Sequence, residues 1–334
     1  MRIGNLATGI VLGPYVLNLI DSSILNISSE LRKIALIIIL TRAGLGLDIT
    51  GLKKIGRPAI LMCFLPASFE LLGIILIAPK ALGMSVLEAA IMGAVLAAVS
   101  PAVVVPRMVK LMDNGYGTAK GIPQLILAGA SVDDVYVIVL FSTFTGMMQG
   151  KGASIINFVN IPVSIILGMG IGILAGYLLA MYFEKIHIRD TVKVLLILSI
   201  SFILVATEDM LNTPIKFSAL IAIMFVGATV NINYLGNMGI KALIVIFGAL
   251  IFRMAGVFVC LIKTELNKKE RLFTMMAYTP KATVQAAIGG IPLALNFACG
   301  ETVLTIAVLA IVITAPLGTF AIDLSYKKLL RRNE

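Results

Sequence analysis

The sequence has little charge and almost none of the side chains that soluble enzymes use for catalysis. Only 13% of its 334 residues are Asp, Glu, Lys or Arg, whereas soluble proteins carry about 25%. Tryptophan is absent, His187 is the single histidine, and the three cysteines lie in apolar stretches without the spacing of a metal site. These absences exclude soluble enzymes, nucleic-acid-binding domains, disulfide scaffolds and disordered chains. We therefore expect no enzymatic activity, no cofactor and no nucleic-acid partner.

Long apolar runs fill the sequence instead. A helix needs about 20 mostly apolar residues to cross a bilayer, and a membrane barrel would show alternating rather than continuous apolar residues. The sequence therefore predicts an all-α, multi-pass membrane protein that forms a single domain over residues 1–334. We expect eleven spans, at 4–20, 34–47, 58–79, 87–106, 121–148, 154–183, 194–207, 217–232, 242–262, 272–298 and 302–325.

The net charge of +10 reflects basic loops, which orient the chain because Lys and Arg collect on the cytoplasmic side. Three alternate loops carry the basic residues of the first half, at 48–57, 107–120 and 184–193. The basic loop 263–271 and the basic C-terminal tail should also be cytoplasmic, yet eleven spans place both outside. One crossing is therefore missing between about Glu208 and Lys241, where the segment 217–232 is too short to cross twice.

Five charged residues lie inside predicted spans, where charge is costly and indicates function: Glu70, Asp133, Asp134, Arg253 and Lys281. Asp133 and Asp134 are adjacent in an otherwise apolar helix, and two carboxylates there cannot both carry charge at low cost. Such a pair can hold a proton or a small cation such as Na⁺, and competition between the two is what exchange requires. The alternative is a pair neutralised by internal Arg or Lys, with no role in transport.

Two predicted spans are interrupted by proline. The breaks lie at Ser100–Pro101 and at Thr279–Pro280–Lys281. Proline removes a backbone donor, so the freed carbonyl groups need partners in protein or in a polar cavity. We expect the ends of the broken helices to face an ion site, with Lys281 offsetting the negative C-terminal ends. Simple proline kinks are the alternative.

The two breaks occupy matching places in two units of three spans each, residues 58–148 and 242–325, with linking or dimerisation helices over 154–232. Adding the missing crossing would make these units inverted repeats, as in many secondary transporters. Glu70 and Arg253 precede the two breaks, and each is otherwise alone in its span. We expect them to form a buried ion pair that holds the units together. Pairing of Arg253 with Asp133 is the alternative.

Several stretches resemble the sodium/proton exchangers of the NHA branch of the cation:proton antiporter superfamily. They include LRKIALIIILTRAGLGLD, GAVLAAVSPAVVVPRM, GYGTAKGIPQLILAGASVDD, TPKATVQAAIGGIPLAL and TIAVLAIVITAP. The resemblance implies the antiporter fold, with two crossing broken helices, a dimerisation domain and a homodimer. It also implies exchange of Na⁺ or Li⁺ for H⁺ across a bacterial cytoplasmic membrane.

The resemblance further implies residue roles: Asp134 binds the ion or proton, and Asp133 and Ser100 assist. Relatives often carry Thr-Asp before the first proline, where this chain has Val99–Ser100, so that extra carboxylate is absent. Compared with relatives, the chain is expected to lack an N-terminal helix and about one internal crossing. An inactive truncated homologue and a sodium-coupled solute symporter are the two alternative functions.

Overall fold

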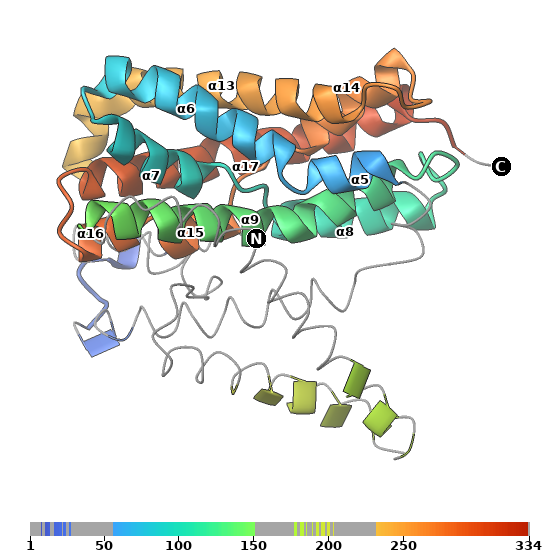
Figure 1. The fold of residues 1–334 in the computed structure, drawn as a ribbon, viewed down its shortest axis with the longest axis horizontal. Helices are drawn as coiled ribbons and strands as arrows, with labels where there is room; N and C mark the ends of the chain where they lie inside the picture. Colours follow the sequence, from blue (N-terminus) through green and yellow to red (C-terminus); the bar gives the residue numbers. More distant parts are fainter. Residues whose placement is uncertain are drawn as a thin grey trace.

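The computed structural model describes residues 56–150 and 232–332, together with scattered residues within 8–27 and 177–203. Within these residues every named element is a helix (Figure 1), which confirms the predicted all-α class. Five helical stretches are long and apolar enough to cross a membrane: Arg57–Leu82, Val86–Asp113, Ile122–Met148, Gly239–Cys260 and Gly300–Leu329. The expected spans at 4–20, 34–47, 154–183, 194–207 and 217–232 lie wholly or largely outside the described residues.

The first unit begins with α5 (Arg57–Met62) and α6 (Leu65–Leu82), which follow each other within one span. Each helix has a proline in its first turn, where the missing N–H is not needed. Helix α7 (Val86–Leu96) starts at a capping box in which Ser85 and Glu88 exchange side-chain and backbone hydrogen bonds. Gly83, at a φ of 70°, ends α6 and turns the chain towards α7.

Two broken helices follow the predicted breaks. Helix α7 ends at Leu96, residues 97–100 are not helical, and α8 (Pro101–Asp113) resumes at the proline. In the second unit, α14 (Lys268–Ala277) is followed by a non-helical stretch, and α15 (Thr283–Ile288) and α16 (Ile291–Ala294) continue after it. The fold thus contains the two interrupted helices that the sequence predicts.

The remaining elements are the long helices α9 (Ile122–Met148), α13 (Ile232–Cys260) and α17 (Gly300–Leu329). Helix α14 starts four residues before the predicted span 272–298, because an Asn267–Glu270 capping box begins it in a charged stretch. The first turn of α14 is charged, so the apolar run in the sequence does not include it. Helix α13 also extends beyond its predicted span 242–262, by ten residues at its N-terminal end.

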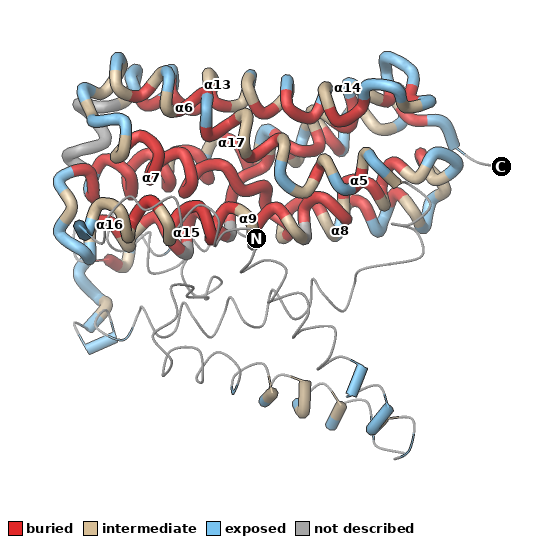
Figure 2. The backbone as a smooth tube through the Cα atoms, in the orientation of Figure 1, coloured by how far each residue is buried: buried red, intermediate tan, exposed pale blue. Residues whose placement is uncertain are grey.

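Burial separates an inner from an outer layer (Figure 2). In the most apolar part of each span, 83% of the residues in Val86–Asp113 are buried, against 39% in Gly239–Cys260 and 39% in Arg57–Leu82. Helices α6 and α13 pack against each other closely, and a Cβ added at Gly73 would lie 2.6 Å from Phe252. Small residues allow such close approach between membrane helices.

The broken helix α7–α8 is an inner element of the described structure, because most of its residues are buried.

The buried apolar residues form two clusters, one towards each end of the helices. Along α9, Ala130 belongs to one cluster and Val137 to the other. Asp133 and Asp134 therefore lie between the clusters, at the level where α7–α8 and α14–α15 are interrupted. The fold places the unusual charges of the sequence in one buried layer.

Candidate functional site

The two interrupted helices are joined through their backbones. The backbone N–H of Ser100 donates to the carbonyl oxygen of Pro280 at 2.8 Å. In the other direction, the Gln285 side-chain amide donates to the carbonyl oxygens of Leu96 at 3.2 Å and Ala98 at 2.8 Å. Groups that lose their intrahelical partners at one break are thus satisfied by the other break.

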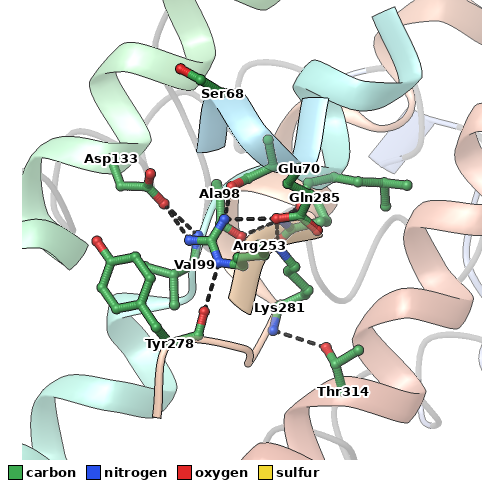
Figure 3. Close-up of polar contacts among 12 residues, drawn as sticks. Ser68, Glu70, Ala98, Val99, Asp133, Arg253, Tyr278, Lys281, Gln285 and Thr314 are labelled. Carbon is green, nitrogen blue, oxygen red and sulfur yellow. Dashed lines mark hydrogen bonds and ion pairs between the residues drawn. The ribbon is translucent and has the colours of Figure 1, made fainter. Parts of the chain in front are cut away.

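Arg253 of α13 is the centre of the charged layer and is fully buried (Figure 3). Its guanidinium donates to the Glu70 carboxylate at 2.7 Å and to the Asp133 carboxylate at 2.8 Å. It also donates to the carbonyl oxygens of Tyr278, at 2.6 Å, and Ala97. Both pairings that the sequence left as alternatives are therefore present together, and one side chain connects α6, α9 and the two breaks.

Lys281 lies in the second break and contacts the same acid from another side. Its ammonium group is 2.5 Å from Glu70 Oε2, and its backbone N–H donates to Thr314 Oγ1 of α17 at 2.9 Å. From the sequence we expected Lys281 to offset the negative C-terminal ends of the broken helices, whereas in the structure its ammonium group pairs with Glu70. That contact is decided by side-chain packing between residues 211 positions apart.

The two adjacent aspartates differ in their surroundings. Asp133 Oδ2 accepts hydrogen bonds from Arg253 and from the backbone N–H of Val99, the latter at 2.8 Å. Asp134 is equally buried, but its Oδ1 has no hydrogen-bond partner among the described residues. Asp133 is therefore held by the scaffold through its Oδ2 atom, and each aspartate keeps its Oδ1 atom without a partner among the described residues.

Three further buried oxygens near this layer also have no hydrogen-bond partner in the described part of the chain. They are Asp133 Oδ1, Ser100 Oγ and Gln285 Oε1. Each belongs to a residue whose other polar atoms are bound at the crossing or to Arg253. Unsatisfied buried oxygens are costly, so each of them calls for a partner such as a proton, a water molecule or a cation.

Charge balance separates Asp134 from the other acids. Three carboxylates lie in this layer, those of Glu70, Asp133 and Asp134, against the two cations of Arg253 and Lys281. Ion pairs connect both cations to Glu70 or Asp133. Asp134 is thus the acid that lacks an ion-pair partner among the described residues. No group of three or more His, Cys, Asp or Glu that could hold a metal ion occurs there either.

Three residues of the site were not predicted from the sequence: Gln285, Tyr278 and Thr314. Gln285 and Thr314 are uncharged polar residues inside apolar runs, and that pattern could have indicated them. Tyr278 supplies a carbonyl acceptor to Arg253, and its ring centroid lies 4.9 Å from the guanidinium carbon. Its hydroxyl donates to the carbonyl of Met62 at 3.0 Å. The sequence offers no signal for these contacts.

Replacing Gln285 with methionine should destabilise the crossing. The change leaves the buried carbonyl oxygens of Leu96 and Ala98 without their side-chain donor, and each unsatisfied group costs about 1–3 kcal/mol. We expect a lower melting temperature of the detergent-purified protein. Gln149→Met, at an exposed position after α9, is the control and should melt like the unmodified protein. Equal melting of the two variants would contradict the assigned role of Gln285.

Comparisons with known proteins agree with this architecture. Residues 1–237 match the family described as "Sodium/hydrogen exchanger, transmembrane". Human sodium/hydrogen exchanger 9B2 is 33% identical over 353 residues, covering 92% of this chain and 65% of the relative. Mouse sodium/hydrogen exchanger 9B1 is 32% identical, covering 92% and 62%. The chain thus spans slightly less than two thirds of the length of these relatives.

The solved structure of the sodium proton antiporter MjNhaP1 from Methanocaldococcus jannaschii at pH 8 is similar in fold. The TM-score is 0.81 at 20% sequence identity, and the match covers 98% of this chain and 92% of the other. The alignment with human exchanger 9B2 is longer than this chain, 353 against 334 residues, so it includes parts of the relative that have no counterpart here. Within the stretch of the expected missing crossing, residues 208–231 lie outside the described part, and α13 begins at Ile232. On the family match and the shared fold, the chain belongs to the sodium/hydrogen exchanger family and has the fold of a cation:proton antiporter.

Proposed function

We propose that this protein exchanges Na⁺ or Li⁺ for H⁺ across the membrane and that both ions compete for Asp134. The observation that carries the proposal is the charge balance of the buried layer. Two cations are paired with Glu70 and Asp133, and among the described residues Asp134 remains with an unpartnered carboxylate oxygen. A buried carboxylate without a cationic partner is stable only with a proton or a bound cation.

The surrounding oxygens suit a small hard cation. Asp134 Oδ1, Asp133 Oδ1 and Ser100 Oγ are buried and unpartnered among the described residues, and hard cations prefer oxygen ligands. In this proposal Asp134 and Asp133 are the Na⁺ ligands and Ser100 assists. A proton on Asp134 neutralises the same charge, so the site accepts one ion or the other.

The other charged residues of the layer are assigned to the scaffold. Glu70 and Arg253 hold α6 and α13 together, and Lys281 fixes the second break on Glu70. Pro101, Thr279 and Pro280 keep the two breaks open. We assign residues 58–148 and 242–325 to the two repeat units of the transport core. We also assign residues 154–232 to the linking and dimerisation region of a homodimer in the bacterial inner membrane, and the proposed exchange needs no cofactor.

A small cavity lies beside the ion pair of Glu70 and Lys281, and it is not lined by the aspartates of the proposed ion site. A cavity of about 10 Å³ borders Glu70, Lys281 and Thr314. A space of that size holds about one water molecule, whereas pockets for organic ligands measure about 300–1,000 Å³. The space beside this ion pair is therefore too small for an organic solute.

Competition for one carboxylate gives a distinctive pH dependence. Protonated Asp134 cannot bind Na⁺, so the apparent affinity for Na⁺ falls in proportion to the deprotonated fraction. At pH values where the protonated form dominates, each unit of acidification should raise the apparent KM for Na⁺ about tenfold, with the maximal rate unchanged. The measurement uses proteoliposomes with an internal pH-sensitive dye and external pulses of Na⁺, Li⁺ or K⁺ at pH 6–9.

Two results of this experiment would overturn the proposal. The first is a folded, reconstituted protein that gives no dye response to any of the three cations. The second is a KM for Na⁺ that stays constant across the pH range, which would show that protons and cations do not share a site. Liposomes without protein give the background rate.

A further inference from the structure

A basic cleft lies at one end of the described structure, away from the charged layer. It is formed by the N-terminal end of α14 and the C-terminal end of α17, and it has a volume of about 460 Å³. In Figure 1, α14 and the C-terminus of the chain lie at the same end of the helices. The cleft is lined by Asn267, Lys268, Lys269, Lys328, Leu329, Leu330 and Arg331.

The charge of this cleft is of one sign. Four of its lining residues are basic and none is acidic. None of the four forms an ion pair with another residue in the described part of the chain, although nearby Lys120 and Arg107 pair with Glu270 and Asp323. The positive end of the α14 dipole also lies at this cleft. The site therefore attracts an anion.

The C-terminal wall of the cleft is fixed in position. The backbone N–H of Gly117, in the loop between α8 and α9, donates to the carbonyl oxygen of Arg331 at 2.8 Å. Leu330 is buried beside Gly117, and the Tyr116 and Tyr326 rings pack edge to face at 4.9 Å between centroids. Arg331 is therefore held beside the end of α17 on an ordered backbone. The cleft is built before any ligand arrives.

An exposed apolar stripe on α17 leads to the cleft. Leu317, Phe320 and Leu324 are 52%, 60% and 74% exposed. They are spaced three and four residues apart, and Lys328 follows four residues later, so all four share one helix face. Because α17 is long and apolar enough to span the membrane, this face runs from the hydrocarbon region to the basic cleft at the surface.

We infer that the cleft binds the phosphate headgroup of an anionic phospholipid of the cytoplasmic leaflet. The acyl chains lie along Leu317, Phe320 and Leu324, and the phosphate lies between Lys268, Lys328 and Arg331. Basic clusters next to the cytoplasmic end of a span attract anionic lipid in general, and the loop charges place this end on the cytoplasmic side. A soluble phosphate compound would use the cations but not the stripe. The inference does not depend on transport activity.

Thermal stability of the full chain in detergent tests the inference. Phosphatidylglycerol at saturating concentration should raise the melting temperature by about 3–5 °C, since a ligand bound only by the folded state stabilises it. Phosphatidylcholine should leave it unchanged. In the variant Lys268→Gln/Lys328→Gln/Arg331→Gln, at least half of the shift should be lost. These side chains are exposed, so the variant should fold.

The matched control removes the same charge elsewhere. Lys80→Gln/Lys110→Gln/Lys241→Gln lies at three exposed or partly exposed positions outside the cleft and should keep the full shift. Equal loss of the shift in both triple variants would overturn the inference, because it would show only a net-charge effect. A full shift with glycerol phosphate or inorganic phosphate alone would also overturn it, in favour of a soluble ligand.

Photo-crosslinking gives a second measurement that needs no variant. A phosphatidylglycerol carrying a photoreactive acyl chain should label peptides that contain residues 317–332 or 268–273. Labelling confined to other helices would contradict the assigned site.

Discussion

Replacing Asp134 with asparagine should reduce cation–proton exchange to the rate of empty liposomes while leaving the protein folded. Asparagine has nearly the same shape but cannot take up a proton or carry a charge, so neither ion can neutralise the site. The Oδ1 atom of Asp134 has no hydrogen-bond partner among the described residues, so the substitution breaks no known bond of that atom. The measurement is the proteoliposome dye assay, with Na⁺ and Li⁺ pulses across pH 6–9.

The control for Asp134→Asn is Glu265→Gln, which removes one carboxylate charge at an exposed position. Glu265 uses its backbone carbonyl, not its side chain, to accept a hydrogen bond from Lys120. The control should exchange ions at the unmodified rate. Normal Na⁺-dependent proton movement by Asp134→Asn would show that another group carries the ion.

Replacing Arg253 with methionine should destabilise the protein strongly and abolish exchange. The change leaves the buried Asp133 without its ion-pair partner and removes one of the two cations on Glu70. Removing one partner of a buried ion pair costs about 3–5 kcal/mol, because the other charge stays buried. The carbonyl acceptors of Tyr278 and Ala97 also lose their donor. We expect little folded protein after purification.

A double variant separates this electrostatic effect from a loss of packing. Arg253→Met/Asp133→Asn removes the stranded carboxylate together with the guanidinium and restores the net charge of the layer. The loss of stability in the double variant should be smaller than the sum of the losses in the two single variants. Thermal unfolding can be followed with a thiol-reactive dye, because Cys260 and Cys299 are buried and Cys63 is partly buried. Additive losses would contradict the central role of Arg253 in charge balance.

Much of the fold could be predicted from the sequence, because bilayer physics leaves strong signals. The apolar runs locate the described spans to within about ten residues, and Pro101 and Pro280 mark both interrupted helices. Charged residues in apolar spans are rare, so the sequence indicates all five charged residues of the buried layer. The sequence predicted the Glu70–Arg253 pair, with Arg253–Asp133 as the alternative. It did not indicate that both pairs form together or that Lys281 pairs with Glu70.

Pairing depends on contacts between distant segments. Arg253 donates to Asp133, which is 120 residues away in the sequence, and to Glu70, which is 183 residues away. The packing of the helices determines whether such distant groups come within hydrogen-bond distance. Gln285 was missed because a single uncharged polar residue in an apolar run is a weaker signal than a buried charge. The start of α14 was missed because its capping box lies in a charged loop. The sequence therefore indicated the charged residues and the Glu70–Arg253 pair, but not the full set of bonds around them.

The exchange of bonds between the two breaks has a mechanical consequence. Ser100 and Gln285 tie the first interrupted helix to the second in both directions. Neither break can hinge open alone without losing buried hydrogen bonds, so the two helices should travel as one rigid body. Asp134, fixed on α9 beside them, would move with that body. In the proposed exchange, alternating exposure of the ion to the two sides of the membrane then requires displacement of the whole unit relative to its surroundings, not a local gate at the prolines.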